Sequence, residues 1–335
     1  MITFGIPSFN RVEYLEDLVS SIYKCDIKSF ELLIVEDCSP QRVDIRKTVK
    51  TLINKYSSST KPINYVENEI NIGFDKNLKK IINEALGEHI IFIGNDDIVV
   101  PKEMTKYVNE TFQNANACVF LRGYKTFDQL RSEVTSTKIV HQSRWAKKYD
   151  DMNTIYRFSG IISGFCVNKK FASEIVTDKF DGGLFYQIYL AFAAYDRASV
   201  YLSSSIPVLC RRDIAPEFGH SINETEFVAG NYNLKSRMHM AQAHLDIAEH
   251  LKANFDQNFI KLYKKAMSQN IAPHLITLQQ NKLRDMTKMY LFLIKIGIGR
   301  NLRSLAIYFI SIIFNQTRTA IILNRISNFF RMSTR

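Results

Sequence analysis

Two adjacent carboxylates, Asp96 and Asp97, are the residues of this chain whose types and spacing most directly suggest chemistry. They follow the apolar run 89–93 and stand in a turn-like segment, Gly-Asn-Asp-Asp. An apolar run of that length between turn residues predicts a buried strand, so the pair is expected at a strand's C-terminal end, where open α/β sheets bind ligands. Neighbouring carboxylates repel each other unless a divalent cation or a substrate hydroxyl shares them. The pair therefore suggests a metal site, and an ordinary polar turn is the alternative.

Polar and turn-forming residues also follow the earlier predicted strands. Strands are expected over residues 2–6, 31–35 and 63–66, and the segments after them are 7–11, 36–40 and 71–77. The carboxyl ends of parallel strands meet at one edge of a sheet. We expect these segments to converge on one site, because solvated turns have no reason to carry Pro, Asn, Asp and Gly at every strand end.

The strands that carry these segments alternate with helices. Helical spacing of apolar residues is expected over 12–23, 43–56 and 75–85, a further helix begins at Pro101, and a strand follows over 117–121. This alternation predicts the α/β class, with a doubly wound, mostly parallel sheet. The pattern weakens over 125–165, and from residue 231 onward it is almost wholly helical. The sheet is therefore expected to carry a helical C-terminal extension.

Composition favours a folded protein of a reducing compartment. With 335 residues and 46% hydrophobic content, the chain can bury a large core. Its five cysteines are odd in number, widely spaced and without a C-x-x-C pair, which argues against a disulfide framework and a zinc site. The chain opens on a strand-like run without the basic and apolar regions of a secretory signal. We expect a cytoplasmic protein.

The net charge of +11 is concentrated near the C-terminus. Residues 281–335 contain ten Lys and Arg against one acid, Asp285, a balance of +9. The apolar groups between these charges are roughly half the ~20 residues of a membrane-spanning helix. Basic amphipathic helices with aromatic residues are typical of the surface of an anionic membrane, where each Lys or Arg adds about 1 kcal/mol of attraction. We expect this tail on a membrane surface; a solvated basic face is the alternative, and no nucleic-acid-binding pattern occurs.

Four motifs in this order and spacing resemble those of the family 2 glycosyltransferases, nucleotide-sugar-dependent enzymes of bacterial surface-polysaccharide assembly with the Rossmann-like GT-A fold. Residues 6–11, Ile-Pro-Ser-Phe-Asn-Arg, resemble the family's I-P-[ST]-[YF]-N-R, and residues 35–39 resemble its V-D-D-G-S. Residues 71–77 are similar to N-x-G-x-x-x-N, and residues 92–97 with Pro101 are similar to F-L-D-x-D-D followed by Pro. The resemblance covers about residues 1–125, with weaker support to about residue 220.

The resemblance implies a GT-A domain over residues 1–225, followed by the helical, basic, amphipathic region 226–335. Within the domain, 1–125 would be the donor-binding half and 126–225 the acceptor half. The implied reaction moves a sugar from a nucleotide-diphosphate donor to a saccharide acceptor, expected to be lipid-linked, by an inverting single displacement with Mg²⁺ or Mn²⁺. Such an enzyme of lipopolysaccharide or capsule synthesis would work peripherally at the inner face of the cytoplasmic membrane, and a homodimer stays open.

Carried over position by position, the resemblance implies donor contacts in the first three motifs. Pro7, Phe9 and Asp37 would hold the nucleobase and ribose, and Asp37 would accept a hydrogen bond from a base N–H or a sugar hydroxyl. The remaining donor-side residues of these motifs are Ser8, Arg11, Gly73 and Asn77.

The same resemblance implies roles for the charged residues. Lys76 stands where the family often has Arg, which keeps the charge but loses bidentate phosphate geometry. Asp96 would contact the ribose or donor sugar, and Asp97 would bind the metal that bridges the diphosphate. Two positions depart from the motifs, because Glu36 and Gly94 each replace an Asp.

The catalytic base of an inverting transferase is a carboxylate within hydrogen-bond reach of the acceptor hydroxyl. The E-D dipeptide that usually supplies it in the family, before a helix and roughly 80 to 100 residues after the metal site, has no match in that window of this chain. In the corresponding window, Asp181 precedes a helix expected over 184–195 and is the candidate base, with Asp178 as the reserve. The alternative is that Asp181 only caps this helix. Just upstream, residues 163–165 could line the acceptor site or form a plain turn.

A further candidate is the aperiodic segment 211–221, which begins with Arg211 and Arg212. Such a loop could close over the donor, hold its diphosphate with charge-assisted hydrogen bonds and exclude water. Solvated surface arginines are the alternative.

Two other functional classes stay open at this point. A nucleotidyltransferase that makes a nucleotide sugar also uses a doubly wound sheet and metal-binding acids, but it is expected to open with a Gly-rich, basic phosphate loop, which residues 7–11 do not provide. A non-catalytic nucleotide- or glycan-binding module would have no need for both Asp97 and a base.

Overall fold

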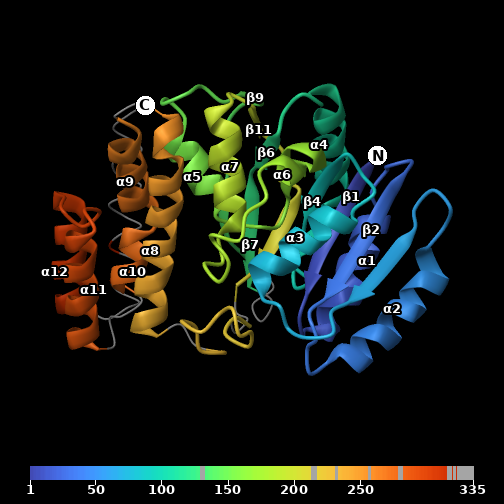
Figure 1. The fold of residues 1–335 in the computed structure, drawn as a ribbon, viewed down its shortest axis with the longest axis horizontal. Coiled ribbons are helices and arrows are strands. Elements are labelled where there is room, and N and C mark those ends of the chain that lie inside the picture. The colour runs from blue at the N-terminus through green and yellow to red at the C-terminus, as the bar shows by residue number, and fades with distance from the viewer. Residues whose placement is uncertain are drawn as a thin grey trace. The chain divides into compact units, whose positions relative to one another are not determined.

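The computed structural model of the chain describes residues 1–128, 133–212, 217–230, 233–255, 258–277 and 282–314, together with residues 319 and 322. The chain divides into two compact units, Met1–Asn231 and Tyr232–Arg335. The first unit contains the sheets, and the second is helical over its described residues (Figure 1).

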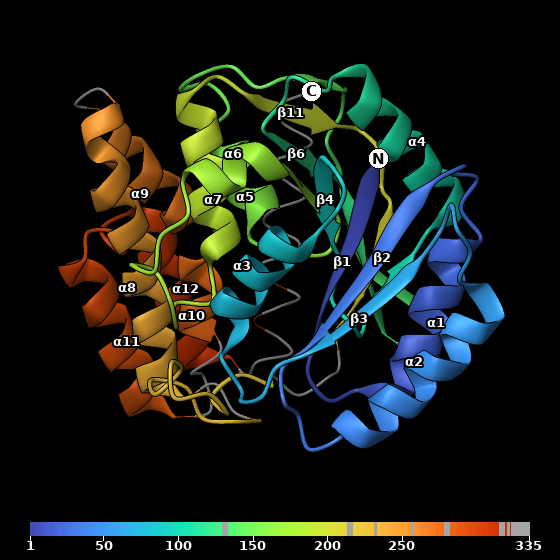
Figure 2. The same cartoon turned by 45° about the vertical axis from the view of Figure 1, so that its right-hand side comes forward.

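The larger sheet begins with four parallel strands in the order β3-β2-β1-β4. These are β1 (Ile2–Ser8), β2 (Phe30–Glu36), β3 (Ile63–Glu67) and β4 (His89–Phe92). All but the outermost, β3, are nearly continuous apolar runs with buried side chains, as strands covered on both faces require. The helices between them are α1 (Val12–Tyr23), α2 (Arg42–Tyr56) and α3 (Phe74–Glu84). Figure 2 shows α1 and α2 on one face of the sheet and α3 on the other. The predicted doubly wound, mostly parallel sheet is confirmed.

Beyond β4 the sheet continues with a strand that runs in the opposite direction. β10 (Phe165–Asn168) pairs antiparallel with both β4 and β6 (Val119–Arg122). β6 pairs in parallel with β11 (Val200–Ser203), and β9 (Arg144–Trp145) pairs antiparallel with β11 at the edge. Because β10 runs back along β4, the residues just before β10 lie beside the residues just after β4.

A second sheet of four strands has the order β5-β12-β7-β8. Its strands are β5 (Ile98–Val99), β12 (Val208–Arg211), β7 (Tyr124–Asp128) and β8 (Glu133–Lys138). The sequence pattern does not predict these strands. β5 has only two residues, and β8 is an exposed, mostly polar edge strand. The pairing of β12 with β5 matters for the site, since β5 directly follows Asp97 and β12 ends at Arg211.

The remaining helices of the first unit are α4 (Pro101–Gln113), α5 (Met152–Ser159), α6 (Lys169–Glu174) and α7 (Tyr186–Asp196). α4 begins at Pro101, a residue that suits the first turn of a helix because it has no N–H to leave unpaired. α7 is buried along almost its whole length, including its polar Gln187.

The second unit contains α8 (Leu234–Leu251), the 3₁₀ turn η1 (Lys252–Asn254), α9 (Phe259–Asn270), α10 (Ala272–Thr277), α11 (Leu283–Lys295) and α12 (Leu302–Ile313). Among the described residues, no helix combines the length and the apolar character needed to cross a membrane. The predicted basic tail 281–335 is described from residue 282 to 314 and at 319 and 322; its basic residues Arg318, Arg325, Arg331 and Arg335 lie outside the described residues.

Candidate active site

The Asp97 carboxylate is buried at the carboxyl edge of the larger sheet. Its backbone N–H donates to the Gly94 carbonyl at 3.1 Å, which closes a turn directly after β4. The residue is 7% exposed; one carboxylate oxygen accepts from the Arg211 backbone N–H at 2.9 Å, and the other accepts from the Ser163 hydroxyl. Burial, with the charge of Asp96 adding to it, raises the pKa of Asp97 to about 7. A nearby cation would therefore stabilise the ionised form of this carboxylate.

Two arginines from distant parts of the chain meet at Asp96. Arg11, just after β1, forms an ion pair with the Asp96 carboxylate at 2.7 Å. Arg211, at the end of β12, donates from Nε to the Asp96 carbonyl oxygen at 2.6 Å. The guanidinium of Arg211 also lies over the Tyr14 ring, 4.4 Å from its centroid, so this side chain braces the acidic turn. The side chain of Arg212 is exposed.

A buried cation that the sequence pattern does not single out, Arg122 at the end of β6, fixes the loop that carries Ser163. Its guanidinium donates to the backbone carbonyls of Phe158 at 2.9 Å, Ile161 at 2.9 Å and Ser163 at 2.8 Å. A Cβ at Gly164, whose φ is 82°, would lie 2.6 Å from Arg122 Nε, so the loop can wrap the guanidinium this closely only with glycine there. Arg122 thus sets the position of Ser163. The one signal in the sequence is a charged residue at the end of the apolar run 117–121.

Asp37, directly after β2, is held by the loop that follows β3. Its Oδ1 accepts from the Asn68 amide at 2.7 Å and the Ile72 N–H at 2.9 Å, and its Oδ2 accepts from the Gly73 N–H at 2.9 Å. The Asn68 amide also donates to the side chain of Asn77 at 3.3 Å. Burial raises the pKa of Asp37 to about 6, in spite of these hydrogen bonds. The structure therefore brings Asp37, Gly73 and Asn77 into one network.

Glu36, where the motif has Asp, has a structural role in the same turn. Its carboxylate accepts from the backbone N–H groups of Cys38 at 3.0 Å and Ser39 at 2.8 Å. Cys38 has a left-handed φ of 54° at the position where the motif has Gly. The acidic side chain thus stabilises a turn that glycine would otherwise favour.

Several buried polar atoms near these strand ends have no hydrogen-bond partner within the described part of the chain. Three of them are Ser8 Oγ, Asn10 Oδ1 and Ser39 Oγ. Ser8 is the last residue of β1, one after Pro7, and Ser39 lies two residues after Asp37, so the atoms belong to neighbouring strand ends. Buried polar atoms are normally satisfied, so these are suited to a ligand or ordered water.

The segment 217–224 extends from the end of β1 to the start of α3. Glu217 accepts from the Asn10 amide at 3.0 Å, and the His220 ring packs against Phe9 with centroids 5.0 Å apart. Glu224 accepts from the Phe74 N–H at 2.7 Å, in the first turn of α3, where a negative charge is favourable. This segment includes the end of the predicted closing loop 211–221, of which residues 213–216 lie outside the described residues.

Asp181 lies against α3. Its Oδ1 is 2.7 Å from Lys79 Nζ and its Oδ2 is 3.9 Å from Lys76 Nζ, and its side chain is 10% exposed. Asp178 also pairs with Lys79, but its side chain is 87% exposed. Lys76, predicted at the donor, therefore lies beside the candidate base.

A different carboxylate binds the backbone at the start of α7. Asp75, in the first turn of α3, accepts from the Leu184 N–H at 2.9 Å and the Tyr186 N–H at 3.2 Å. Burial raises the pKa of Asp75 to about 7, with smaller contributions from the charges of Asp181 and Glu224. Asp75 thus joins α3 to the start of α7.

Asp96 and Asp97 are the acidic side chains that this site offers to a divalent cation. Across the described ranges, no group of three or more His, Cys, Asp or Glu side chains forms a ready metal cage. Mg²⁺ commonly binds one or two carboxylates and completes its shell with water and substrate phosphates, and carboxylate oxygens can accept more than one bond. The two carboxylates fit an ion that binds together with a phosphorylated ligand.

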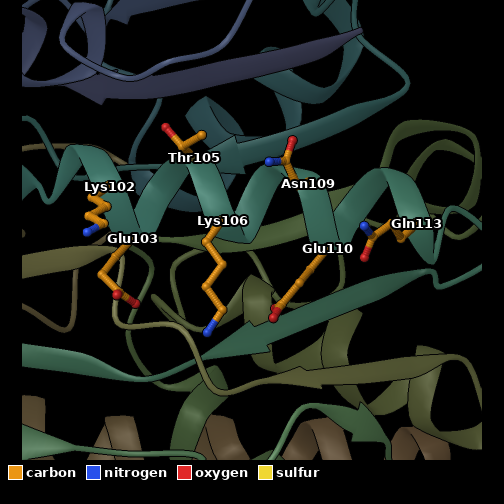
Figure 3. A pocket seen from close by; sticks show the side chains of 7 residues that line it. All are labelled: Lys102, Glu103, Thr105, Lys106, Asn109, Glu110 and Gln113. Carbon is orange, nitrogen blue, oxygen red and sulfur yellow. The ribbon is translucent and has the colours of Figure 1, made fainter.

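A separate hollow of about 460 Å³ lies along α4, away from these residues. Figure 3 shows its lining side chains, all from this helix: Lys102, Glu103, Thr105, Lys106, Asn109, Glu110 and Gln113. Glu103 accepts from the Ile206 N–H at 3.1 Å and Glu110 binds the Ser203 hydroxyl, so these acids hold the chain between β11 and β12. The hollow contains none of the predicted site residues.

The sheet order and the acidic pair at its carboxyl edge define a protein of the GT-A fold. The sequence model of Glycosyl transferase family 2 matches residues 3–176, more than half of the chain, and the chain belongs to that family. The predicted family is confirmed.

Relatives with similar sequences are named as glycosyltransferases. The abequosyltransferase RfbV of Salmonella typhimurium is 24% identical over 152 residues, which are 45% of this chain and 43% of that protein. An uncharacterized glycosyltransferase of Haemophilus influenzae is 28% identical over 116 residues, 35% of this chain and 36% of that protein. The match thus spans less than half the length of either relative.

Solved structures with the same fold include two complexes with nucleotide sugars. Staphylococcus aureus TarS 1-349 in complex with UDP-GlcNAc has a TM-score of 0.60 and 15% identity, over 92% of this chain and 90% of that chain. The mannosyltransferase PcManGT of Pyrobaculum calidifontis, in complex with GDP-Man and Mn²⁺, has a TM-score of 0.52 and 13% identity, over 91% of this chain and 77% of that chain. The predicted GT-A fold is confirmed.

Proposed function

We propose that this glycosyltransferase moves a sugar from a nucleotide-diphosphate donor to a lipid-linked saccharide acceptor, with inversion, in bacterial surface-polysaccharide synthesis. The observation that carries the proposal is the convergence of Asp37, Asp96 and Asp97, from the ends of neighbouring strands, beside buried polar atoms with free hydrogen-bonding capacity. Similarity to an abequosyltransferase and to a putative colanic acid biosynthesis glycosyl transferase of Escherichia coli supports the pathway class.

The nucleoside of the donor would bind at the ends of β1 and β2. Pro7 and Phe9 offer apolar surface to the base, and Ser8 Oγ and Asn10 Oδ1 can bond to polar groups of a ligand. Asp37 is oriented toward the 68–73 loop by its three hydrogen bonds, and its carboxylate keeps acceptor capacity for a ribose hydroxyl or a base N–H.

The acidic turn would face the diphosphate. Asp97, with Asp96 beside it, would hold Mg²⁺ or Mn²⁺, and the ion would supply positive charge to the leaving diphosphate. The structure of PcManGT in complex with GDP-Man and Mn²⁺ supports the use of a divalent ion. Arg11 balances Asp96 across a 2.7 Å ion pair and keeps the turn in place before the donor arrives. Arg211 and Arg212 are proposed at the phosphate side of the same turn, Arg211 through its contact with Asp96.

Asp181 is the proposed general base. The ion pairs with Lys79 and Lys76 hold its carboxylate in one orientation, so an oxygen can accept the proton of an acceptor hydroxyl as that hydroxyl attacks the sugar. The 217–224 segment, which extends from β1 to α3, would help to exclude water from the donor. Asp178, exposed and paired with the same lysine, is the reserve.

The enzyme is proposed to work peripherally at the inner face of the cytoplasmic membrane, where a lipid-linked acceptor would be presented. The basic residues of 282–314 support this location. Membership of the family favours this reaction over nucleotide-sugar synthesis.

The proposal is tested by incubating the whole protein with radiolabelled UDP-, GDP-, CDP- and dTDP-sugars and measuring slow donor hydrolysis. One donor class should be hydrolysed with Mg²⁺ or Mn²⁺ and not in excess EDTA. Asp97→Asn should lower the rate at least 10²-fold, comparable to removing a group that stabilises developing charge. The matched control is Asp44→Asn, an exposed acid of α2, which should keep the wild-type rate. Full activity in EDTA, or hydrolysis of no donor, would contradict the proposal.

A further inference from the structure

α12 buries its two serines and exposes most of its large apolar residues. Its buried side chains are Ser304, Ile307 and Ser311. Leu302 is 85% exposed, Phe309 53% and Ile313 71%. A surface helix normally turns its apolar stripe toward the core and its polar residues toward water, so this arrangement is reversed.

The exposed apolar residues of α12 form one continuous face. They are Leu302, Leu305, Phe309, Ile312 and Ile313, and at 3.6 residues per turn they cover roughly 120° of the helix circumference, opposite the buried residues. Arg303 is the single charged residue of α12. The outward side of the helix therefore has a wide surface that gains free energy when water leaves it.

The neighbouring helix α11 presents a basic stripe. Arg284, Lys288 and Lys295 are exposed at helical spacing, whereas Met286, Met289 and Leu293 are buried. The Tyr290 ring of α11 stacks on the Tyr308 ring of α12, with centroids 4.5 Å apart, so the two helices lie side by side. Figures 1 and 2 show the ribbons of α11 and α12 next to each other. The basic stripe and the apolar face thus belong to the same pair of helices.

Charge decides between the partners that could cover this face. The sequence has no Asp or Glu from residue 286 to residue 314, but it has Lys288, Lys295, Arg300 and Arg303. A second copy of the chain would bring the same positive charges together, which is unfavourable. A bilayer with anionic headgroups offers both complementary charge and an apolar interior.

We propose that the outward face of α12, with the basic stripe of α11 beside it, is a docking surface for an anionic lipid bilayer. The apolar side chains enter the headgroup region, the Lys and Arg side chains contact lipid phosphates, and α12 lies along the surface without crossing it. The proposal rests on the proposed membrane location for its choice of partner, and it assigns that location to a helix face. Its test requires no turnover.

The test is co-sedimentation of the whole protein with vesicles of phosphatidylcholine alone or mixed with phosphatidylglycerol. The wild type should pellet with the anionic vesicles and much less with the neutral ones. Phe309→Gln/Ile313→Gln should weaken this binding about tenfold or more, because each substitution removes the free energy gained when an apolar side chain moves from water into the bilayer. These residues point outward, so circular dichroism and thermal unfolding should match the wild type. The matched control, Leu86→Gln, changes an apolar residue of the first unit that is equally exposed and should leave binding unchanged.

A second pair of variants tests the electrostatic part. Lys288→Glu/Lys295→Glu should bind anionic vesicles weakly and with little dependence on salt, whereas Lys24→Glu/Lys50→Glu, which reverses two exposed lysines of α1's end and α2, should behave like the wild type. Equal pelleting of the wild type and the α12 variant would overturn the proposal, as would a lipid-free dimer that the α12 substitutions dissociate. Donor hydrolysis in lipid-free buffer tests the proposed function separately from vesicle binding. A protein that binds anionic vesicles but hydrolyses no donor would contradict the proposed function and leave the docking surface standing.

Discussion

Arg122 places a positive charge in the protein interior. The backbone carbonyls of residues 158, 161 and 163 accept the hydrogen bonds that water would accept from an exposed guanidinium. Through that loop it positions Ser163, whose hydroxyl donates to Asp97 and accepts from the Gly94 N–H at 2.8 Å. The shape of the acidic turn therefore depends on a residue that touches neither carboxylate.

We predict that Arg122→Lys lowers kcat for donor hydrolysis about tenfold or more, because a lysine keeps the charge but cannot reach three carbonyls at once. Ser163→Ala should lower kcat by a similar factor. Since both act on Asp97 through the Ser163 hydroxyl, the double variant should be little worse than either single one, which a double-mutant cycle measures. Arg197→Lys, at an exposed site, is the control. If the losses of kcat in the two single variants, expressed as free energies, add up fully in the double variant, Arg122 and Ser163 do not act through the same hydroxyl.

A second residue-level prediction concerns Asp181. Asp181→Asn keeps the shape of the side chain and removes the proton acceptor, so transfer should fall by about 10²–10⁴-fold while donor affinity changes little. Asp178→Asn is the matched control, because its carboxylate pairs with the same Lys79 but is almost fully exposed. The measurement compares transfer kinetics with donor affinity from equilibrium binding. If Asp181→Asn stays active and Asp178→Asn is inactive, the role of general base belongs to Asp178, three residues upstream.

At the scale of elements, the first half of the sheet could be predicted because its strands are buried on both faces. β1, β2 and β4 appear in the sequence as nearly continuous apolar runs, and the helices between them have a clear 3.6-residue period. The small sheet could not be predicted in this way. β8, with Glu-Val-Thr-Ser-Thr-Lys, owes its pairing to β7 and not to burial, and β5 has only two residues.

The residues of the site also divide into those that the sequence pattern predicts and those that it does not. Asp37, Asp96 and Asp97 could be found because each directly follows a predictable strand. Arg122 and Glu224 could not, because their partners are backbone groups of distant segments that only the tertiary fold brings near. Lys76 and Lys79 lie on a predicted helix, but their pairing with Asp181 depends on where the 178–186 loop passes.

Asp75 links two elements, since it lies in α3 and binds backbone N–H groups at the start of α7. Its pKa, about 7 in the folded protein against 3.8 ordinarily, means that the folded state binds more protons than the unfolded state between these values. The free energy of unfolding should therefore fall as pH rises from about 4 to about 7, by up to about 4 kcal/mol from this group.

The test of this prediction is Asp75→Asn, compared with the wild type by urea unfolding from pH 4 to pH 7.5. The variant loses an acceptor for one backbone N–H. It should therefore be less stable than the wild type at pH 4, where Asp75 is protonated and burying the neutral carboxyl group costs little free energy. The difference should shrink toward pH 7.5, where the wild type carries a buried charge. Asp44→Asn, at an exposed site, should follow the wild type throughout. A stability difference that is constant with pH would rule out this linkage.

At the scale of the whole molecule, the chain combines a sheet unit that carries the proposed chemistry with a helical unit that carries the proposed docking surface. An enzyme that docks on the surface where its acceptor is embedded converts a three-dimensional search into a local one, which raises the effective acceptor concentration. Docking should then matter for transfer to a membrane-bound acceptor and not for chemistry on the soluble donor.

We therefore predict that Phe309→Gln/Ile313→Gln leaves donor hydrolysis in lipid-free buffer unchanged but lowers transfer to an acceptor in anionic vesicles about tenfold or more. Raising the salt concentration toward 1 M, where the Debye length is about 3 Å, should lower the vesicle rate of the wild type and affect lipid-free hydrolysis far less. The apolar contacts of α12 are not screened, so part of the vesicle rate should persist at high salt in the wild type and be absent in the variant. Parallel losses in both assays would mean that α12 supports the fold of the enzyme, and the division of work between the two units would then be wrong.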